Sequence, residues 1–466
     1  MNAPSTRTLA QVDAAWAWAP FEPGPDGDWD LAAAAHLYRR AGFGATWGEL
    51  GQAMAGTPAA AVERLVHGGE GSEAFEKHLI DSARSLLSGS KIENLAGWWL
   101  YGMLNAPRPL HERMTLFWHG HFATSFAKVR HAELIFQQHQ VLRRHALGRF
   151  GDMLTAIARD PAMLLWLDSA TNRRSHPNEN FAREVMELFC LGLGNYSEDD
   201  IREAARAFTG WEVRHKQFTF NRYQYDDGLK TVLGKTGRWS GDDVLAILLE
   251  HPATARFLTT KLFRHFITET EEPPARLIEP LADEYRRRDY DTAWLLQSML
   301  GSKLFFSPLA RRQKIKAPVE LAVGLLRGLE GTTNYFRLAR DVATLGQALF
   351  EPPTVKGWNG GREWLHSAAM VGRLNLVWAL VSGTDPEYGT KCDVAALLAR
   401  QGIDSPPAAI ERLSLLLLGE APPSTLQVKL AAVATGPDGQ DRLNTDRLRY
   451  ARLVQALAAL PEFQLA

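Results

Sequence analysis

Two carboxylates, three positions apart, are the residues in this sequence best suited to chemistry. Glu184 and Glu187 lie in the segment 178–192, which has the apolar periodicity of a helix. At 100° of rotation per residue, Glu184 falls between Leu188 and Leu191, inside the apolar arc, and Glu187 lies at its edge. A carboxylate among apolar neighbours is costly unless it is paired, protonated or bound to a metal. The pattern predicts either a buried Glu–Arg or Glu–His pair that ties helices together, or a catalytic or metal-binding carboxylate.

Two histidines separated by one residue are the second candidate. If the helix before them continues, His121 lies on its apolar face and His119 points nearly the opposite way. Both rings face one ion only if the chain becomes extended near Gly120, because residues i and i+2 align in a strand. Two interpretations follow. One is a divalent metal site (zinc, iron or manganese) formed by His119, His121 and Glu184. The other is a core His121 that donates to a backbone carbonyl, with His119 on the surface.

Two more polar residues belong to the expected site. Asp168 begins a stretch rich in Asp and Asn, residues 168–180, between two helices. This composition is typical of turns and caps, although functional residues also favour loops. Arg183 directly precedes Glu184, and a guanidinium is suited to orient a carboxylate or an anionic substrate.

Two loop segments are weaker candidates. Residues 225–230 combine two acids with Lys230 and are typical of a charged turn. Residues 352–361 are rich in Pro and Gly and contain Trp358. Such a loop either lines a pocket or packs its tryptophan against the core, and the composition favours packing.

The triplet Gly234-Lys235-Thr236 resembles part of a phosphate-binding loop. That motif requires a glycine at position 229, which is Leu229 here. No apolar strand leads into the triplet, so we predict no nucleotide site.

Helical periodicity dominates from Trp29 onward and predicts a mainly α fold, a large multi-helix globular array. Expected helices include 109–119, 131–159, 178–191, 198–209 and 252–268. Residues 217–225 alternate with period two and predict one small β-hairpin or extended insertion. We expect an irregular N-terminal arm (1–29), a main helical domain (30–382) and a small C-terminal helical subdomain (383–466).

Composition narrows the function classes. The 466 residues carry a net charge of -1, which gives no overall basis for binding nucleic acid or an anionic membrane. Two cysteines, Cys190 and Cys392, exclude a disulfide framework and a zinc ribbon. The sequence shows no signal peptide and no apolar run long enough to span a membrane, so the expected compartment is the cytoplasm.

The candidate segments belong to longer motifs that occur in a recognisable order. They are His36-Leu37-Tyr38-Arg39-Arg40-Ala41-Gly42-Phe43-Gly44, Phe117-Trp118-His119-Gly120-His121-Phe122, Asn178-Glu179-Asn180-Phe181-Ala182-Arg183-Glu184-Val185-Met186-Glu187-Leu188, Phe208-Thr209-Gly210-Trp211 and Pro352-Pro353-Thr354-Val355-Lys356-Gly357-Trp358. Over roughly residues 30–380, this text resembles the bacterial domain-of-unknown-function 1800 family.

The resemblance implies a long helical protein. Many members carry export signals, and their genes often lie beside a sulfatase-like family, which implies a sulfatase-like partner. The chain departs from the family pattern at Tyr225 and Phe189, where we expect histidines. Either departure weakens a metal site that uses those positions. The resemblance supplies no established catalytic residues.

Two hypotheses follow. The first is a metal- or acid/base-dependent enzyme, a hydrolase or oxidase. In it the site is built from His119, His121, Glu184 and Glu187, with Asp168 and Arg183 around it. Glu184 acts as metal ligand or general base, and the histidines bind the ion. The second is a non-catalytic helical binding or scaffold protein that acts with a partner such as the sulfatase-like protein.

Overall fold

The computed structural model describes residues 8–68, 72–87, 91–389, 392–435 and 446–466. It confirms the mainly α prediction. The α-helices are α1 (Ala14–Trp18), α2 (Leu31–Ala41), α3 (Trp47–Met54), α4 (Pro58–His67), α5 (Ser72–Leu87), α6 (Ile92–Asn105), α7 (Pro109–His121), α8 (Phe126–Val129), α9 (Ala132–His145), α10 (Phe150–Ala158), α11 (Pro161–Trp166), α12 (Asn180–Glu184), α13 (Glu198–Ala207), α14 (Gly241–Glu250), α15 (Pro252–Phe266), α16 (Ala275–Arg287), α17 (Thr292–Leu300), α18 (Lys303–Phe306), α19 (Pro318–Gly328), α20 (Tyr335–Thr344), α21 (Ser367–Ser382), α22 (Val394–Arg400), α23 (Pro406–Leu418), α24 (Ser424–Thr435) and α25 (Asp446–Ala458).

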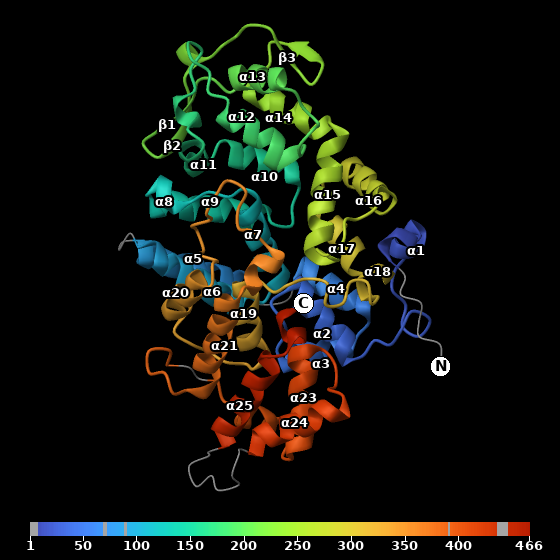
Figure 1. Cartoon of the computed structure of the whole chain (residues 1–466). Helices are drawn as coiled ribbons and strands as arrows, with labels where there is room; N and C mark the ends of the chain where they lie inside the picture. The colour runs from blue at the N-terminus through green and yellow to red at the C-terminus, as the bar shows by residue number, and fades with distance from the viewer. Residues whose placement is uncertain (1–7, 69–71, 88–90, 390–391, 436–445) are drawn as a thin grey trace.

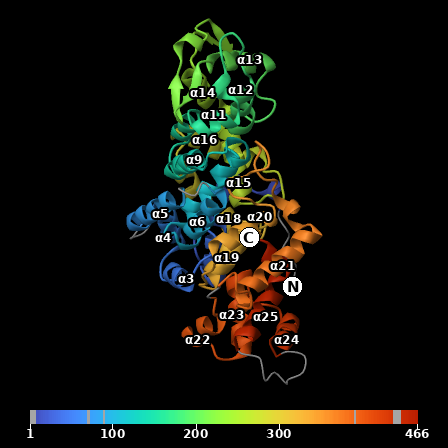
Figure 2. The same ribbon diagram turned by 90° about the vertical axis from the view of Figure 1, so that its left-hand side faces the viewer.

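Short elements of other types interrupt these helices. The 3-10 turns are η1 (Leu9–Gln11), η2 (Ser169–Thr171), η4 (Arg222–Gln224), η5 (Gly361–Leu365) and η6 (Pro461–Gln464), and η3 (Val185–Cys190) is a π-helix. In both ribbon views the molecule is elongated (Figures 1 and 2). Helices α10–α14 and the strands form one end, α21–α25 form the other, and α4–α7 and α15–α19 lie between them.

Capping residues set the start of several helices. Ser197 accepts the backbone N–H of Asp200 at 3.2 Å, while the Asp200 carboxylate accepts the Ser197 N–H at 2.9 Å. This capping box begins α13 at the start of the helix expected over 198–209. The single helix expected at 131–159 is instead two helices, because α9 ends at His145 and Gly148 lies in the turn before α10.

Two small hairpins are present where the sequence predicts one. Strand β1 (Trp211–Arg214) pairs antiparallel with β2 (Gln217–Phe220), and β3 (Lys230–Val232) pairs with β4 (Lys235–Gly237). Leu233 and Gly234 connect the second pair with φ of 49° and 77°, the positive values of a two-residue hairpin turn. The second hairpin was missed because its strands are only three residues long. Gly234 therefore belongs to a hairpin turn and Lys235 to the strand after it, a geometry different from that of a phosphate-binding loop.

Buried apolar side chains form two clusters. The first joins residues of the N-terminal arm, such as Leu9 and Phe21, to α2, α7 and α10–α18, so the expected arm packs into the core. The second contains side chains of α6, α19 and α21–α25. The boundary expected at residue 382 stays a prediction, and the second cluster runs across it. Within the described ranges, no helix is both long and apolar enough to cross a bilayer.

A buried ion-pair network joins the two clusters. Arg113 on α7 is 1% exposed, and its Nη2 lies 2.8 Å from the Glu320 carboxylate on α19. Lys314 Nζ lies 2.7 Å from the same carboxylate. Burial acts to raise the pKa of Glu320, but the two cations outweigh it and lower that pKa to about 2.

We predict that Glu320→Gln strongly destabilises the protein. Removing the carboxylate leaves Arg113 and Lys314 buried without their counter-ion, at a cost of about 3–5 kcal/mol. Because the folded-state pKa of Glu320 is lowered, the stabilisation is present above the ordinary carboxyl pKa and is lost as the pH falls toward 2. Thermal unfolding near neutral pH measures the effect. The control, Glu250→Gln, removes an exposed pair with Lys235 and should cost less than about 1 kcal/mol. Equal losses in both variants would contradict the network's role.

Candidate functional site

Helix α7 remains helical through His121. The Phe122 N–H donates to the Trp118 carbonyl at 2.8 Å and closes the last turn. Residues two apart on a helix are rotated by about 200°, so the two imidazoles diverge. The extended geometry that would let His119 and His121 share one ion is therefore wrong.

His121 is a buried ring with both nitrogens engaged. Its Nε2 lies 3.1 Å from the Phe189 carbonyl oxygen, and its Nδ1 lies 2.9 Å from Lys261 Nζ. Burial, with a further contribution from Lys261, lowers the pKa of His121 well below its usual value. The neutral ring then donates from Nε2 and accepts at Nδ1. His121 therefore lies in the core and donates to a backbone carbonyl, which is one half of the second interpretation.

His119 is buried rather than on the surface, contrary to expectation. Its Nε2 accepts the Phe350 backbone N–H at 3.2 Å, and it lies edge-on to Trp99 and Trp358 at ring-centroid distances of 5.3 and 5.4 Å. Burial lowers the pKa of His119 to about 3. His119 therefore packs α7 against α6 and the segment that contains Phe350.

The expected helix over 178–191 consists of α12 followed by the π-helix η3. The Leu191 N–H donates to the Met186 carbonyl at 2.7 Å, five residues back, which is the π pattern. This wide turn ends the helix at Cys190. The Phe189 carbonyl accepts its hydrogen bond from His121. Single π turns often occur at functional sites.

Glu184 lies at the junction of α12 and η3 and is half-buried. Burial raises the pKa of Glu184, and the neighbouring charge of Glu187 raises it further. Glu187 accepts a hydrogen bond from the Tyr196 hydroxyl at 2.8 Å. Within the part of the chain that the structure describes, Glu184 has neither a hydrogen-bond nor an ion-pair partner. The buried ion pair weighed from the sequence is therefore not formed.

Asp168 and Arg183 are engaged elsewhere. The exposed Asp168 carboxylate accepts Lys128 Nζ at 2.8 Å. Arg183 makes two bonds to Glu198, at 2.7 and 2.8 Å, and a longer one of 3.4 Å to Glu179. Nothing in these contacts brings Asp168 or Arg183 to the carboxylate of Glu184.

Lys261 is a candidate site residue that the sequence analysis does not identify. It lies on α15, partly exposed, with its Nζ against His121 and 5.0 Å from the Phe257 ring centre. Burial lowers the pKa of Lys261 to about 8. The available signal was the spacing of Phe257, Lys261 and His265, which at i, i+4 and i+8 share one helix face.

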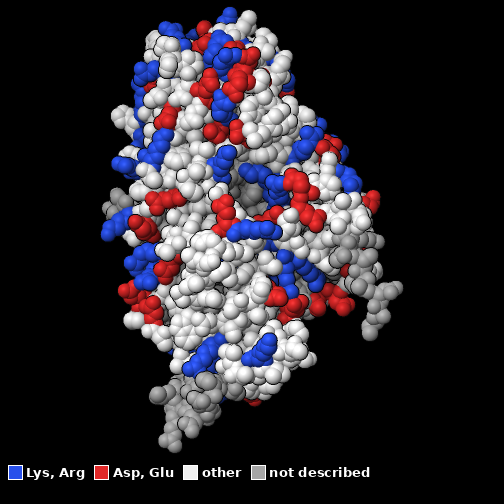
Figure 3. Space-filling view, viewed as in Figure 1, with Lys and Arg blue, Asp and Glu red and all other residues white. Residues whose placement is uncertain are grey.

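A hollow opens between α7 and α15 in the space-filling view (Figure 3), with charged side chains around it. The loop 352–361 lies on the last turn of α7. Gly357 has φ of +84°, and a Cβ there would stand 2.5 Å from the Gly120 carbonyl oxygen. Only a glycine permits this approach. The same loop carries Lys356, whose charge partly offsets the raised pKa of Glu184.

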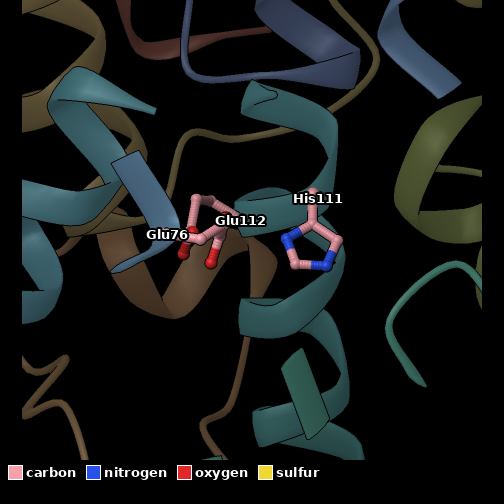
Figure 4. Close-up of side chains that lie close together, drawn as sticks. All are labelled: Glu76, His111 and Glu112. Atoms are coloured by element: carbon pink, nitrogen blue, oxygen red, sulfur yellow. The ribbon is translucent and has the colours of Figure 1, made fainter. Parts of the chain in front are cut away.

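Another group, Glu76, His111 and Glu112, has the composition of a metal site. Their ligand atoms lie within 4.8 Å of one another, and Figure 4 shows the His111 ring beside the two carboxylates. Arg143 forms ion pairs with both Glu76 and Glu112, so a guanidinium neutralises these acids. In the described residues, His119, His121 and Glu184 do not form a group of this kind.

Comparison with known proteins confirms the family resemblance expected from the sequence. The family described as protein of unknown function (DUF1800) matches residues 36–465. The chain belongs to this family. No curated protein and no solved structure matches the chain.

We predict that Gly357→Ala disrupts this site. The added methyl group would meet the Gly120 carbonyl oxygen, and alanine is strained at a positive φ. We therefore expect the free energy of unfolding to fall by more than about 1 kcal/mol. Thermal unfolding and near-ultraviolet circular dichroism of the nearby tryptophans report it. Gly360→Ala is the matched control, because its Cβ would meet nothing within 4 Å. A wild-type spectrum and midpoint for Gly357→Ala would show that the loop does not depend on this approach.

Proposed function

We propose that this chain is an enzyme that uses general acid–base catalysis at the end of α7, with Lys261 and Glu184 as the proton-transferring groups. The observation that carries the proposal is that the pKa values of both groups move toward neutrality. Burial lowers the pKa of Lys261 to about 8 and raises that of Glu184. Paired groups displaced in this way are characteristic of acid–base sites.

His121 fixes the orientation of the lysine. Its Nε2–H is held by the Phe189 carbonyl, so its Nδ1 can only accept from Lys261. The same hydrogen bonds connect η3, which directly follows Glu184, to α15. In the proposed reaction, neutral Lys261 takes a proton from an attacking water or hydroxyl group, and protonated Glu184 gives one to the leaving group. Hydrolysis is the simplest reaction of this form.

The metal-dependent form of the hypothesis has less support. A metal can take His121 as a ligand only after displacing Phe189 or Lys261 from its ring nitrogens. Glu184 and Glu187 remain possible carboxylate ligands on one side of the helix. Elemental analysis of protein purified without chelator tests this form, and stoichiometric metal lost in Glu184→Gln would favour it over the metal-free reaction.

We predict that Lys261 is unusually reactive toward acylating reagents. At pH 7.5 a pKa of about 8 leaves about a quarter of the amine neutral, against about one part in a thousand for an ordinary lysine. Trace acetylation with acetic anhydride, followed by peptide mass spectrometry, measures the relative rates. Lys261 should react at least about tenfold faster than the exposed Lys77, and the difference should disappear in denaturant. A native Lys261 slower than Lys77 at every pH would refute the assignment.

We predict that Glu184→Gln and Lys261→Met each abolish turnover while keeping the fold. The assay is a panel of p-nitrophenyl esters of carboxylic, phosphoric and sulfuric acids, and of glycosides. Loss of a general acid or base should lower kcat/KM by about 10²-fold or more. Glu250→Gln, an exposed control, should retain full activity.

Full activity in both variants would contradict the proposed roles. Turnover of none of these compounds, combined with ordinary Lys261 reactivity, would favour the non-catalytic alternative. In that case the chain is a helical binding protein that acts with a partner, such as a sulfatase-like protein.

A further inference from the structure

A second pocket, away from α7 and α15, is lined by an excess of basic side chains. It has a volume of about 310 Å³ and lies between α2, residues 308–312 and the end of α23. Its charged and titratable lining residues are His36, Arg39, Arg311, Arg312 and Glu420. Three arginines therefore face a single carboxylate.

Two of these arginines have no ion-pair partner in the part of the chain that the structure describes. Arg312 pairs with Glu420 at 2.8 Å and donates to the Leu418 carbonyl at 3.0 Å. Arg39 and Arg311, by contrast, make no ion pair within the described residues, and Arg39 Nη2 and Arg311 Nε are buried without a hydrogen-bond acceptor. Both side chains are partly exposed, but a buried guanidinium nitrogen without an acceptor is costly. Their natural complement is an anion with several oxygens.

Gly419 makes room for one of these guanidinium groups. A Cβ at this position would stand 2.9 Å from Arg39 Nη1 and 3.0 Å from Nη2. Gly419 also has φ of +81°, as the residue that ends α23. The end of α23 therefore lies directly against the Arg39 guanidinium and limits where it can move.

His36 adds an acceptor to this basic pocket. The ring is 2% exposed, and its Nε2 donates to the Phe305 carbonyl at 3.0 Å. Its Nδ1 is buried and has no partner. Burial, and then the neighbouring arginines, lower the pKa of His36, so the ring is neutral and Nδ1 carries a lone pair. This lone pair repels an unprotonated anion oxygen, but it accepts a hydrogen bond from a hydroxyl group of the anion.

We infer that this pocket binds inorganic phosphate, with Arg39 and Arg311 on its oxygens and His36 Nδ1 accepting its P–OH hydrogen. Arg312 adds positive charge to the pocket and keeps its ion pair with Glu420. Inorganic phosphate retains a hydroxyl at neutral and mildly alkaline pH. Sulfate has none, and a phosphate monoester loses its own above a pKa of about 6. The inference does not depend on the proposed acid–base site.

Thermal unfolding at pH 8 tests the inference on the full chain. Saturating sodium phosphate, compared with sodium chloride at equal ionic strength, should raise the midpoint by about 2–3 °C. Sulfate and glycerol 3-phosphate should give a clearly smaller rise. A midpoint in phosphate no higher than that in chloride would overturn the inference. A midpoint in sulfate equal to that in phosphate would overturn the role of His36.

Variants separate specific binding from a general salt effect. Arg39→Gln and Arg311→Gln should each abolish the phosphate-induced rise. Their unliganded midpoints should not fall, because each removes an unpaired cation. Arg340→Gln, which changes an exposed arginine on α20, should leave the rise intact. A rise that persists in both pocket variants would place the phosphate elsewhere and refute the inference.

Discussion

The buried guanidinium of Arg113 is the constraint on which the arrangement of this molecule depends. It bonds the Glu320 carboxylate on α19, donates to His265 Nε2 on α15 at 3.0 Å, and reaches the Gly42 carbonyl after α2 at 3.4 Å. A buried cation is tolerated only where such partners surround it. Helices from both core clusters are therefore held in fixed positions around α7, and the last turn of α7 carries His119 and His121.

Backbone geometry then decides which groups near α7 are free to act. The π turn of η3 ends at Cys190, and the Phe189 carbonyl binds His121. The loop that carries Gly357 packs against Gly120 in the last turn of α7. His121 through both ring nitrogens, and His119 through Nε2, hold these elements together. In the reaction that we propose, the proton-transferring groups are Lys261, whose Nζ lies against His121, and Glu184, which has no hydrogen-bond or ion-pair partner among the described residues.

Sequence periodicity predicted much of this arrangement, but it could not identify contacts between distant segments. It placed Glu184 inside an apolar arc, and in the structure Glu184 is half-buried with a pKa raised by burial. It could not show that His119 is buried, because Phe350 and Trp358, which cover it, come from a segment more than 200 residues away. Lys261 was missed for the same reason. An isolated lysine on an amphipathic helix gives no sign of a histidine partner 140 residues earlier in the chain.

The same distinction between satisfied and unsatisfied groups is the reason that we assign different roles to two adjacent arginines on α2. Arg40 donates to the Ile267 and Ala466 carbonyls at 2.8 Å each, so it fastens α2 to the segments that follow α15 and α25. Arg39 is rotated by 100° from Arg40 on the helix and faces the pocket beside Gly419 instead. The anchored neighbour fixes the backbone from which Arg39 projects. A guanidinium held in this way loses little conformational freedom when an anion arrives, which is the property that a binding residue needs.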